Sequence, residues 1–284
     1  MRAQVARLAN GRLHLNDGPI DLIIACDGRR EDVQLAEDAA TFRFASVLDE
    51  LCAELPLLRR PVGEQPKGGI ANRMWRATSI FKAGHFITPM AAVAGSVAEE
   101  ILGAMVRAAP LNRALVNNGG DIALHLAPGQ SYRAGLMDRP DQPMLFASAE
   151  ISSTDSVRGI ATSGWRGRSF SLGIADAVTV LAESASVADA AATLIANAVD
   201  IPDHPAITRQ PANELQPDSD LGEWLVTTGV GNMSSHDVDI ALSSGLARAR
   251  QFLDRQQICA CALHLAGRTR TLNTQHLAKR LAHA

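Results

Sequence analysis

The stretch 159–199 holds the residues best suited to chemistry. Hydroxyls, glycines and arginines that could surround an anion lie together in it: Thr162, Ser163, Gly164, Arg166, Arg168 and Ser169. Further along, Asp189 and Thr193 are four residues apart, which on a helix places them on one face. A carboxylate and a hydroxyl suit a hard cation such as Mg²⁺. The stretch therefore predicts an anion loop followed by a cation site, as a nucleotide–metal site requires.

Each half of this pattern also has a plain structural explanation. Ser186 and Asp189 have the spacing of a capping box, with aspartate in place of the usual glutamate or glutamine. An aspartate in the first turn also interacts favourably with the helix dipole. The arginine-rich segment is equally typical of a solvated hairpin loop. The residue types leave both interpretations open.

A second candidate is the segment 117–121, which contains Asn118, Gly119, Gly120 and Asp121. Asn-Gly is typical of a tight hairpin turn. The same glycines could bring bare N–H groups to a phosphate, with Asp121 accepting from a sugar hydroxyl. The sequence has no GxSxG, no HExxH and no Cys/His cluster with zinc spacing, so we assign no catalytic residue.

Composition narrows the class of protein. The chain has 284 residues, 46% apolar and 20% charged, which suits one domain over 1–284 or two intimately packed halves. A net charge of −3 gives no reason to expect nucleic-acid binding, which requires a basic face. The four cysteines have no CxxC spacing, and we expect all of them to be buried thiols.

Targeting and membrane segments are not expected. The N-terminus lacks an apolar stretch long enough for a signal peptide, and Glu99 and Glu100 interrupt the longest apolar region, 86–106. We therefore expect a cytoplasmic protein that binds a small molecule and no membrane. Antiparallel sheets leave edges that must be covered, and a homodimer would cover them.

Hydrophobic periodicity and turn residues define the expected elements. Strands are predicted at 3–8, 11–15, 20–26, 113–117, 121–126, 131–138, 145–151, 175–182, 223–229 and 257–264. Helices are predicted at 37–54, 88–107, 186–199, 236–254 and 273–283, and surface loops at 56–69 and 203–221. The order favours an α+β fold with largely antiparallel sheets packed against helices. Neither GxGxxG after a strand nor GxxxxGK[ST] occurs.

The helix predicted at 88–107 has a face of small residues, namely Ala91, Ala92, Ala94, Gly95 and Ala98. Threonine and proline at its start match the residue preferences of helix N-termini. Small side chains allow another backbone, or a flat ligand, to approach closely.

Three long motifs carry a resemblance to a known family. ITPMAAVAGSVAEEIL at 87–102, NNGGDIAL at 117–124 and the stretch 159–199 resemble the UPF0280 family of uncharacterised proteins, within the ApbE superfamily of flavin transferases. The resemblance covers nearly the whole chain and implies an ApbE-like fold.

The resemblance also implies a ligand set. By similarity to the superfamily, Mg²⁺ would be held by Asp189, Thr193 and the carbonyl of Ala161. Gly119, Gly120 and Asp121 would contribute to a pocket for a flavin nucleotide, FAD or FMN. A strand that ends in Asp-x-Pro corresponds here to 137–140.

The chain departs from the superfamily at two segments tied to flavin handling. Residues 89–92 replace a Lys-Gly helix start, and 168–173 replace a His-Ile-Ile-Asp-Pro segment; Asp176 could supply a replacement polar group. Two main hypotheses follow: a Mg²⁺-dependent flavin-nucleotide transferase or pyrophosphatase, or a non-catalytic flavin-binding protein. A third is an enzyme whose pocket now accepts a non-nucleotide.

Overall fold

The computed structural model describes residues 3–137, 145–273 and 277–278. The chain divides into two compact units, neither of which is one continuous segment. The first unit comprises Met1–Tyr132, Ile151–Ala161 and Ala182–Ala190. The second comprises Arg133–Glu150, Thr162–Leu181 and Ala191–Ala284. The boundaries cross strand β8, Gly159–Ser163, and helix α4, Ala185–Ala198, so the predicted site residues are shared between the two units.

The first unit is built on antiparallel strands that hydrogen-bond in the order β1-β2-β3-β4-β5-β8. Their bounds are β1 Gln4–Arg7, β2 Leu13–Asp17, β3 Ile20–Asp27, β4 Arg113–Asn118, β5 Asp121–Leu126 and β8 Gly159–Ser163. Strand β2 alternates between buried and partly exposed residues, because successive side chains of a strand point to opposite faces.

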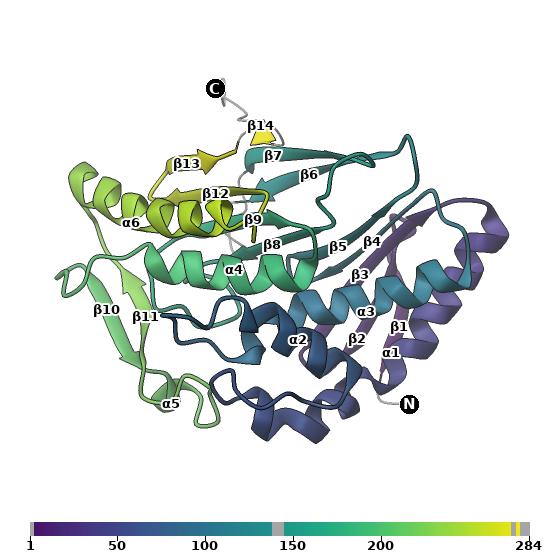
Figure 1. Cartoon of the computed structure of the whole chain (residues 1–284), viewed down its shortest axis with the longest axis horizontal. Helices are drawn as coiled ribbons and strands as arrows, with labels where there is room; N and C mark the ends of the chain where they lie inside the picture. The colour runs from purple at the N-terminus through teal and green to yellow at the C-terminus, as the bar shows by residue number, and fades with distance from the viewer. Residues whose placement is uncertain (1–2, 138–144, 274–276, 279–284) are drawn as a thin grey trace. The chain divides into compact units, whose positions relative to one another are not determined.

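Three long helices accompany this sheet: α1 Arg30–Leu58, α2 Gly69–Ser79 and α3 Val93–Ala108, the last preceded by a 3-10 turn, η1, at Pro89–Ala92. Helix α3 packs on β4 and β5 and against α1 and α2, and Figure 1 shows α1 and α3 on one side of the strands. Phe44, Ile101 and Met105 are fully buried between these layers. The core of the unit therefore lies between the helices and one sheet face.

The prediction that the apolar segment of the first unit is too polar to span a membrane was wrong. Residues Pro89–Ala108 are long and apolar enough for a helix that could cross a membrane, despite Glu99 and Glu100. A buried core helix passes the same test, and α3 packs between strands and helices of its own unit.

The second unit contains further antiparallel strand pairs. Strand β12 pairs with β9 and β13, β10 with β11, and β7 with β14. The bounds are β6 Ser131–Met137, β7 Leu145–Ser152, β9 Ala177–Ala182, β10 Ile207–Pro211, β11 Leu225–Val230, β12 Ala260–Leu265, β13 Arg268–Leu272 and β14 Leu277–Ala278. Helix α6, Ser235–Asp254, packs on β12 and β13, and α5 is the short helix Ala212–Leu215. Helix α4, Ala185–Ala198, belongs to both units.

The α+β class with largely antiparallel strands is confirmed, but several predicted elements differ. Helix α2 and strand β13 were not predicted, and the predicted loop 203–221 contains β10 and α5. Within the predicted helix 273–283, the described residues 277–278 form a strand that pairs with β7. Two residues of the predicted anion loop, Thr162 and Ser163, end strand β8. Of the Asp-x-Pro segment at 137–140, residues 138–140 lie outside the described residues.

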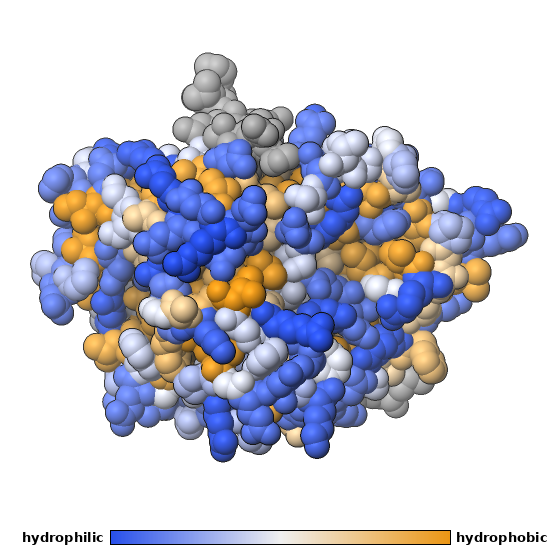
Figure 2. All heavy atoms as spheres, viewed as in Figure 1, coloured by the Kyte–Doolittle hydropathy of each residue, from blue (hydrophilic) through white to orange (hydrophobic). Residues whose placement is uncertain are grey.

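The prediction that all four cysteines are buried was wrong. Cys261 is buried, Cys26 and Cys259 are partly exposed, and Cys52 is exposed. The helical period explains Cys52, because it follows the buried Leu51 and so turns away from the core. Figure 2 shows a face on which hydrophilic atoms predominate and apolar atoms form scattered groups, as is usual for a protein surface.

Candidate functional site

The glycine turn at 119–120 joins β4 to β5 as a two-residue hairpin. Gly119 and Gly120 have positive φ angles of 66° and 117°, which residues other than glycine rarely adopt. The N–H of Gly120 donates to Oδ1 of Asn117 at 2.8 Å. Asn118 and Asp121 are direct partners across the hairpin, so their side chains project from the same face. The turn thus places an amide beside a carboxylate.

This pair lies on the face of the sheet that the helices cover. Asn118 and Asp121 are both buried. Nδ2 of Asn118 donates to the carbonyl of Ala94, in the first turn of α3, at 3.2 Å. The side-chain amide therefore ties the hairpin to the start of α3.

Asp189 reaches the same helix end from α4. Its Oδ2 accepts the N–H of Gly95 at 2.9 Å, and the N–H of Ala94 also bonds this carboxylate. The first N–H groups of a helix have no partner within the helix, and a carboxylate satisfies both their hydrogen bonds and their positive dipole. Asp189 thus caps α3 rather than its own helix.

The ionisation of Asp189 is affected by its burial and by the charge of Asp121. Burial raises the pKa of Asp189 well above its usual range, and the charge of Asp121 raises it further. The N–H groups of Gly95 and Ala94 oppose the shift without cancelling it. Two desolvated carboxylates favour sharing a proton or a cation over both remaining charged and alone. Asp189 as a whole residue keeps part of its surface exposed.

The oxygen atoms present suit a hard cation. Two carboxylates and a neighbouring carbonyl are the donors that Mg²⁺ prefers. Among residues 3–137, 145–273 and 277–278, no three or more histidine, cysteine, aspartate or glutamate side chains come together as a metal cluster. A metal here would therefore need hydroxyl, backbone, water or ligand oxygens as well.

Two glycines allow the start of α4 to approach this site. A methyl group on Gly95 would lie 2.3 Å from the carbonyl oxygen of Ala185, and one on Gly159 would lie 2.2 Å from the N atom of Ala185. Both distances are too short for a real contact. The small-residue face of α3 thus receives a backbone at Gly95, one of the two outcomes predicted for it.

Glu99 of α3 in turn binds the start of α4. Oε1 of Glu99, on α3, accepts the N–H of Ser186 at 2.7 Å and its hydroxyl at 3.0 Å. The Ser184 hydroxyl accepts the next N–H, that of Val187, at 3.3 Å. The start of α4 is therefore capped by Ser184 and Glu99, and a capping box of Ser186 with Asp189 is not formed.

The other two residues of the predicted metal site, Ala161 and Thr193, lie in different units. Ala161 is buried at the end of the β8 segment that belongs to the first unit, with Asp189 and Asp121. Thr193 lies one helical turn after Asp189 in α4, where the chain already belongs to the second unit.

The predicted anion loop belongs entirely to the second unit. Its members there are Thr162, Ser163, Gly164, Arg166, Arg168 and Ser169. The Thr162 hydroxyl is 2.8 Å from that of Thr179, and Arg168 and Ser169 are exposed. The loop therefore presents an arginine and a hydroxyl at the surface.

Arg166 has an internal partner. Its Nε donates to Oδ1 of Asp176 at 3.1 Å, and its guanidinium carbon lies 4.2 Å from the ring centroid of Trp165. Oδ2 of Asp176 accepts the N–H of Ala266 at 2.7 Å. Ion pairing and stacking fix the orientation of Arg166, so its first role is to hold the loop.

Two residues beside the site, Glu99 and Arg73, were not predicted as functional from the sequence. Glu99 was considered only as a charge that interrupts an apolar segment. Arg73 lies on α2, a helix that was not predicted. The available signal was physical: a charged side chain on an otherwise apolar helix requires a partner.

Comparisons with known proteins agree on one family. A family model described as AbpE bacteria matches residues 4–271. A UPF0280 protein of Methanothrix thermoacetophila is 35% identical over 178 residues, which cover 60% of this chain and 70% of that protein.

Two further relatives and one solved structure complete the comparison. The UPF0280 protein of Methanopyrus kandleri is 42% identical over 130 residues, covering 45% of this chain and 48% of its own. That of Archaeoglobus fulgidus is 39% identical over 132 residues, covering 46% and 51%. The chain thus spans about half the length of these two relatives. The apo crystal structure of Pseudomonas stutzeri flavinyl transferase ApbE matches with a TM-score of 0.48 and 12% identity, covering 95% of this chain and 93% of that one.

Proposed function

Since the chain belongs to the UPF0280 family of ApbE-like proteins, we propose that it binds a flavin nucleotide, FAD or FMN, or another phosphate-bearing ligand together with Mg²⁺. The observation that carries the proposal is that the first turn of α3 is bonded both by Asp189, through the N–H of Gly95, and by Asn118, the hairpin partner of Asp121, through the carbonyl of Ala94. The pKa of Asp189 is raised by burial and by the charge of Asp121, which is the electrostatic condition that a bound cation would relieve.

The metal would be held by Asp189, Thr193 and the carbonyl of Ala161. When bound, Mg²⁺ neutralises phosphate charge and polarises the phosphorus toward attack. Asp121 adds negative charge beside Asp189. Gly119 and Gly120 offer backbone without side chains, which permits close approach of a ligand at the turn.

The anion loop offers positive charge and hydroxyls to a phosphate group. Arg168 and Ser169 are exposed and could bind phosphate oxygens directly. Arg166 is held by Asp176 and Trp165, so it would act mainly by fixing the loop. With these parts the chain could serve as a flavin-nucleotide transferase or a pyrophosphatase.

A non-catalytic binding protein is the second candidate. Residues 89–92 form a 3-10 turn of Pro-Met-Ala-Ala, where the superfamily has a Lys-Gly helix start. The segment 168–173 likewise lacks a histidine and an aspartate. By the resemblance, both segments are tied to flavin handling and transfer in the superfamily, so their replacement favours a protein that does not transfer flavin. Turnover of FAD to FMN, or of another phosphoanhydride, would exclude this candidate.

Calorimetric titration with FAD, FMN and ADP, each with and without Mg²⁺, tests the proposal. Asp189→Asn is the informative variant, because its amide oxygen can still accept the N–H of Gly95 while the negative charge is lost. Asp237→Asn is the matched control, since Asp237 also caps a helix, α6, through the backbone N–H of Ser234 at 3.2 Å. We expect Mg²⁺-dependent affinity to be lost in Asp189→Asn only. Equal affinities with and without Mg²⁺ in the unmodified protein would contradict the proposal.

A further inference from the structure

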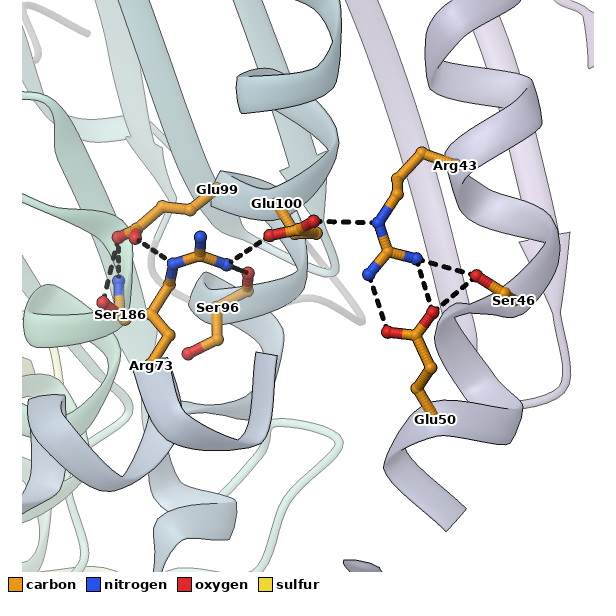
Figure 3. A network of polar contacts seen from close by, with 8 residues as sticks. All are labelled: Arg43, Ser46, Glu50, Arg73, Ser96, Glu99, Glu100 and Ser186. Carbon is orange, nitrogen blue, oxygen red and sulfur yellow. Dashed lines mark hydrogen bonds and ion pairs between the residues drawn. The ribbon is translucent and has the colours of Figure 1, made fainter. Parts of the chain in front are cut away.

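A network of charged side chains leads from the helices of the first unit to the first turn of α4 (Figure 3). Glu99 accepts both polar hydrogens of Ser186, at 2.7 Å from the backbone N and 3.0 Å from Oγ. No more than a fifth of the Glu99 side chain is exposed. Water therefore cannot easily replace this carboxylate as the acceptor of the two hydrogen bonds from Ser186.

Arg73 on α2 fixes this glutamate. Nε of Arg73 lies 3.2 Å from Oε2 of Glu99, the oxygen that Ser186 does not use. Nη1 of Arg73 lies 2.9 Å from Oε2 of Glu100 and donates to the carbonyl of Ser96 at 3.2 Å. One planar guanidinium thus holds two adjacent carboxylates of α3, and each oxygen of Glu99 has a separate partner.

Glu100 shares the partner Arg73 with Glu99, but its carboxylate is directed to a different helix. Glu100 pairs with Arg73 and, at 2.8 Å, with Nε of Arg43 on α1. Figure 3 shows Glu99 directed to α4 and Glu100 directed to α1. The two residues are alike in helix, exposure and charge, and only Glu99 contacts α4 in this network.

Helices α3 and α4 each bind the start of the other through a carboxylate. Ser186 lies three residues before Asp189, and Gly95 lies four residues before Glu99. Glu99 of α3 holds the start of α4, while Asp189 of α4 holds the start of α3. Gly95 lets the two backbones approach. The direction in which Asp189 projects is thereby set by where Glu99 holds Ser186.

We propose that Glu99, oriented by Arg73, is the positioning residue for Asp189. This inference rests on the proposed function for its consequence in metal binding, but its geometric part concerns the protein alone. Residues that orient a metal ligand typically contribute tenfold or more to metal affinity without touching the metal.

The test compares Glu99→Leu with Glu100→Leu. The first readout is amide hydrogen exchange at Gly95, whose N–H bonds Asp189 and not Glu99, measured relative to Met105 in the same helix. We expect exchange at Gly95 to accelerate about tenfold in Glu99→Leu and to remain unchanged in Glu100→Leu. Glu99→Gln keeps an oxygen for Ser186 and should restore most of the protection. If Glu99→Leu does not fold, Glu99→Asp serves, since its shorter side chain cannot span Ser186 and Arg73 together.

The second readout is the ratio of FAD affinities with and without Mg²⁺. We expect it to fall about tenfold in Glu99→Leu and to be unaffected in Glu100→Leu. Unchanged exchange at Gly95 in both Glu99→Leu and Glu99→Asp would overturn the inference, as would equal effects of Glu99→Leu and Glu100→Leu. Accelerated exchange without any Mg²⁺ effect in the unmodified protein would support the positioning role and contradict the proposed function instead.

Discussion

The carboxylate of Asp189 on α4 accepts the backbone N–H of Gly95 on α3 at 2.9 Å, although 94 residues separate them. An aspartate expected to bind a metal or to cap its own helix instead caps a neighbouring one. The two roles are compatible, because a carboxylate has about four lone-pair positions and the two N–H groups of α3 use only some of them.

The tight packing at Gly95 predicts a strong effect of a single methyl group. In Gly95→Ala the new Cβ would lie 2.3 Å from the carbonyl oxygen of Ala185, so α4 must shift. We expect the free energy of unfolding to fall by about 2–3 kcal/mol, as for overpacking in a core. Denaturant unfolding monitored by circular dichroism measures this.

Gly103→Ala is the matched control on the same helix. A methyl group there would meet the flexible end of Arg107, at 3.1 Å, which can move. Alanine is a better helix former than glycine by roughly 0.5–1 kcal/mol, so this variant should be as stable as the unmodified protein or more so. Equal losses in both variants would refute the close approach of α4.

Lowering the pH should reduce the free energy of unfolding, because Glu100 becomes protonated. Burial tends to raise the pKa of Glu100, but hydrogen bonds from Arg43 and Arg73 hold it below its usual value of 4.5. As the pH falls below about 4.5, the unfolded chain takes up this proton before the folded protein does. The stabilisation by ionised Glu100 is therefore present above that pH and is lost as the pH falls through the lower, folded-state pKa.

The unfolding free energy of Glu100→Gln, measured from pH 7 to pH 3, tests this linkage. We expect the variant to be less stable at pH 7 and to depend less on pH below about 4.5 than the unmodified protein. Glu64→Gln, at an exposed position, should follow the unmodified curve. A variant curve parallel to the unmodified one would show that Glu100 does not contribute.

Cysteine reactivity should follow exposure. Cys52 is exposed on α1. Burial raises the pKa of Cys26 to about 11 and that of Cys261 further, which leaves little reactive thiolate at neutral pH. In the folded protein at pH 8, a thiol-specific disulfide reagent should modify Cys52 well before these two. Cys52→Ser should remove the fast phase, and a fast phase that survives the substitution would contradict the assignment.

The ion pair of Arg166 in the anion loop should contribute to stability. Arg166 pairs with Asp176, so Arg166→Met should lower the free energy of unfolding by about 1 kcal/mol. Thermal unfolding measures this loss, and an unchanged unfolding temperature in Arg166→Met would contradict the structural role of the pair. Arg168 is exposed, and calorimetry should show weaker ADP binding in Arg168→Met.

Local signals in the sequence predicted the local features of this fold. The hairpin at Gly119 and Gly120 follows from glycine's access to positive φ. The helix at 186–199 and the small face around Gly95 follow from periodicity and side-chain size. Each of these depends on neighbours within a few residues.

Contacts between distant residues could not be predicted in the same way. The capping box of Ser186 with Asp189 had the right spacing, but α4 begins at Ala185 and its first N–H groups bond Ser184 and Glu99. Nothing near Asp189 in the sequence identifies Gly95 as its partner, because the packing of α3 against α4 creates that contact.

Helix α2 was missed although its signal was present. Its buried residues, Ile70, Ala71, Met74, Ala77 and Thr78, have helical spacing. Helix α2 begins where the predicted proline- and glycine-rich loop 56–69 ends, and no element was predicted for the residues that follow that loop. Because α2 was not predicted, there was no reason to place Arg73 beside Glu99, and the ion pair between them was not predicted.

A metal site at Asp189 can be tested directly by the binding of Mn²⁺, a paramagnetic substitute for Mg²⁺, followed by electron paramagnetic resonance in the presence of FAD. We expect the unmodified protein and Asp237→Asn to bind Mn²⁺ with FAD, and Asp189→Asn to leave the metal free in solution. Equal Mn²⁺ binding by Asp189→Asn and the unmodified protein would contradict a metal site at Asp189. It would leave this aspartate solely as the cap of α3.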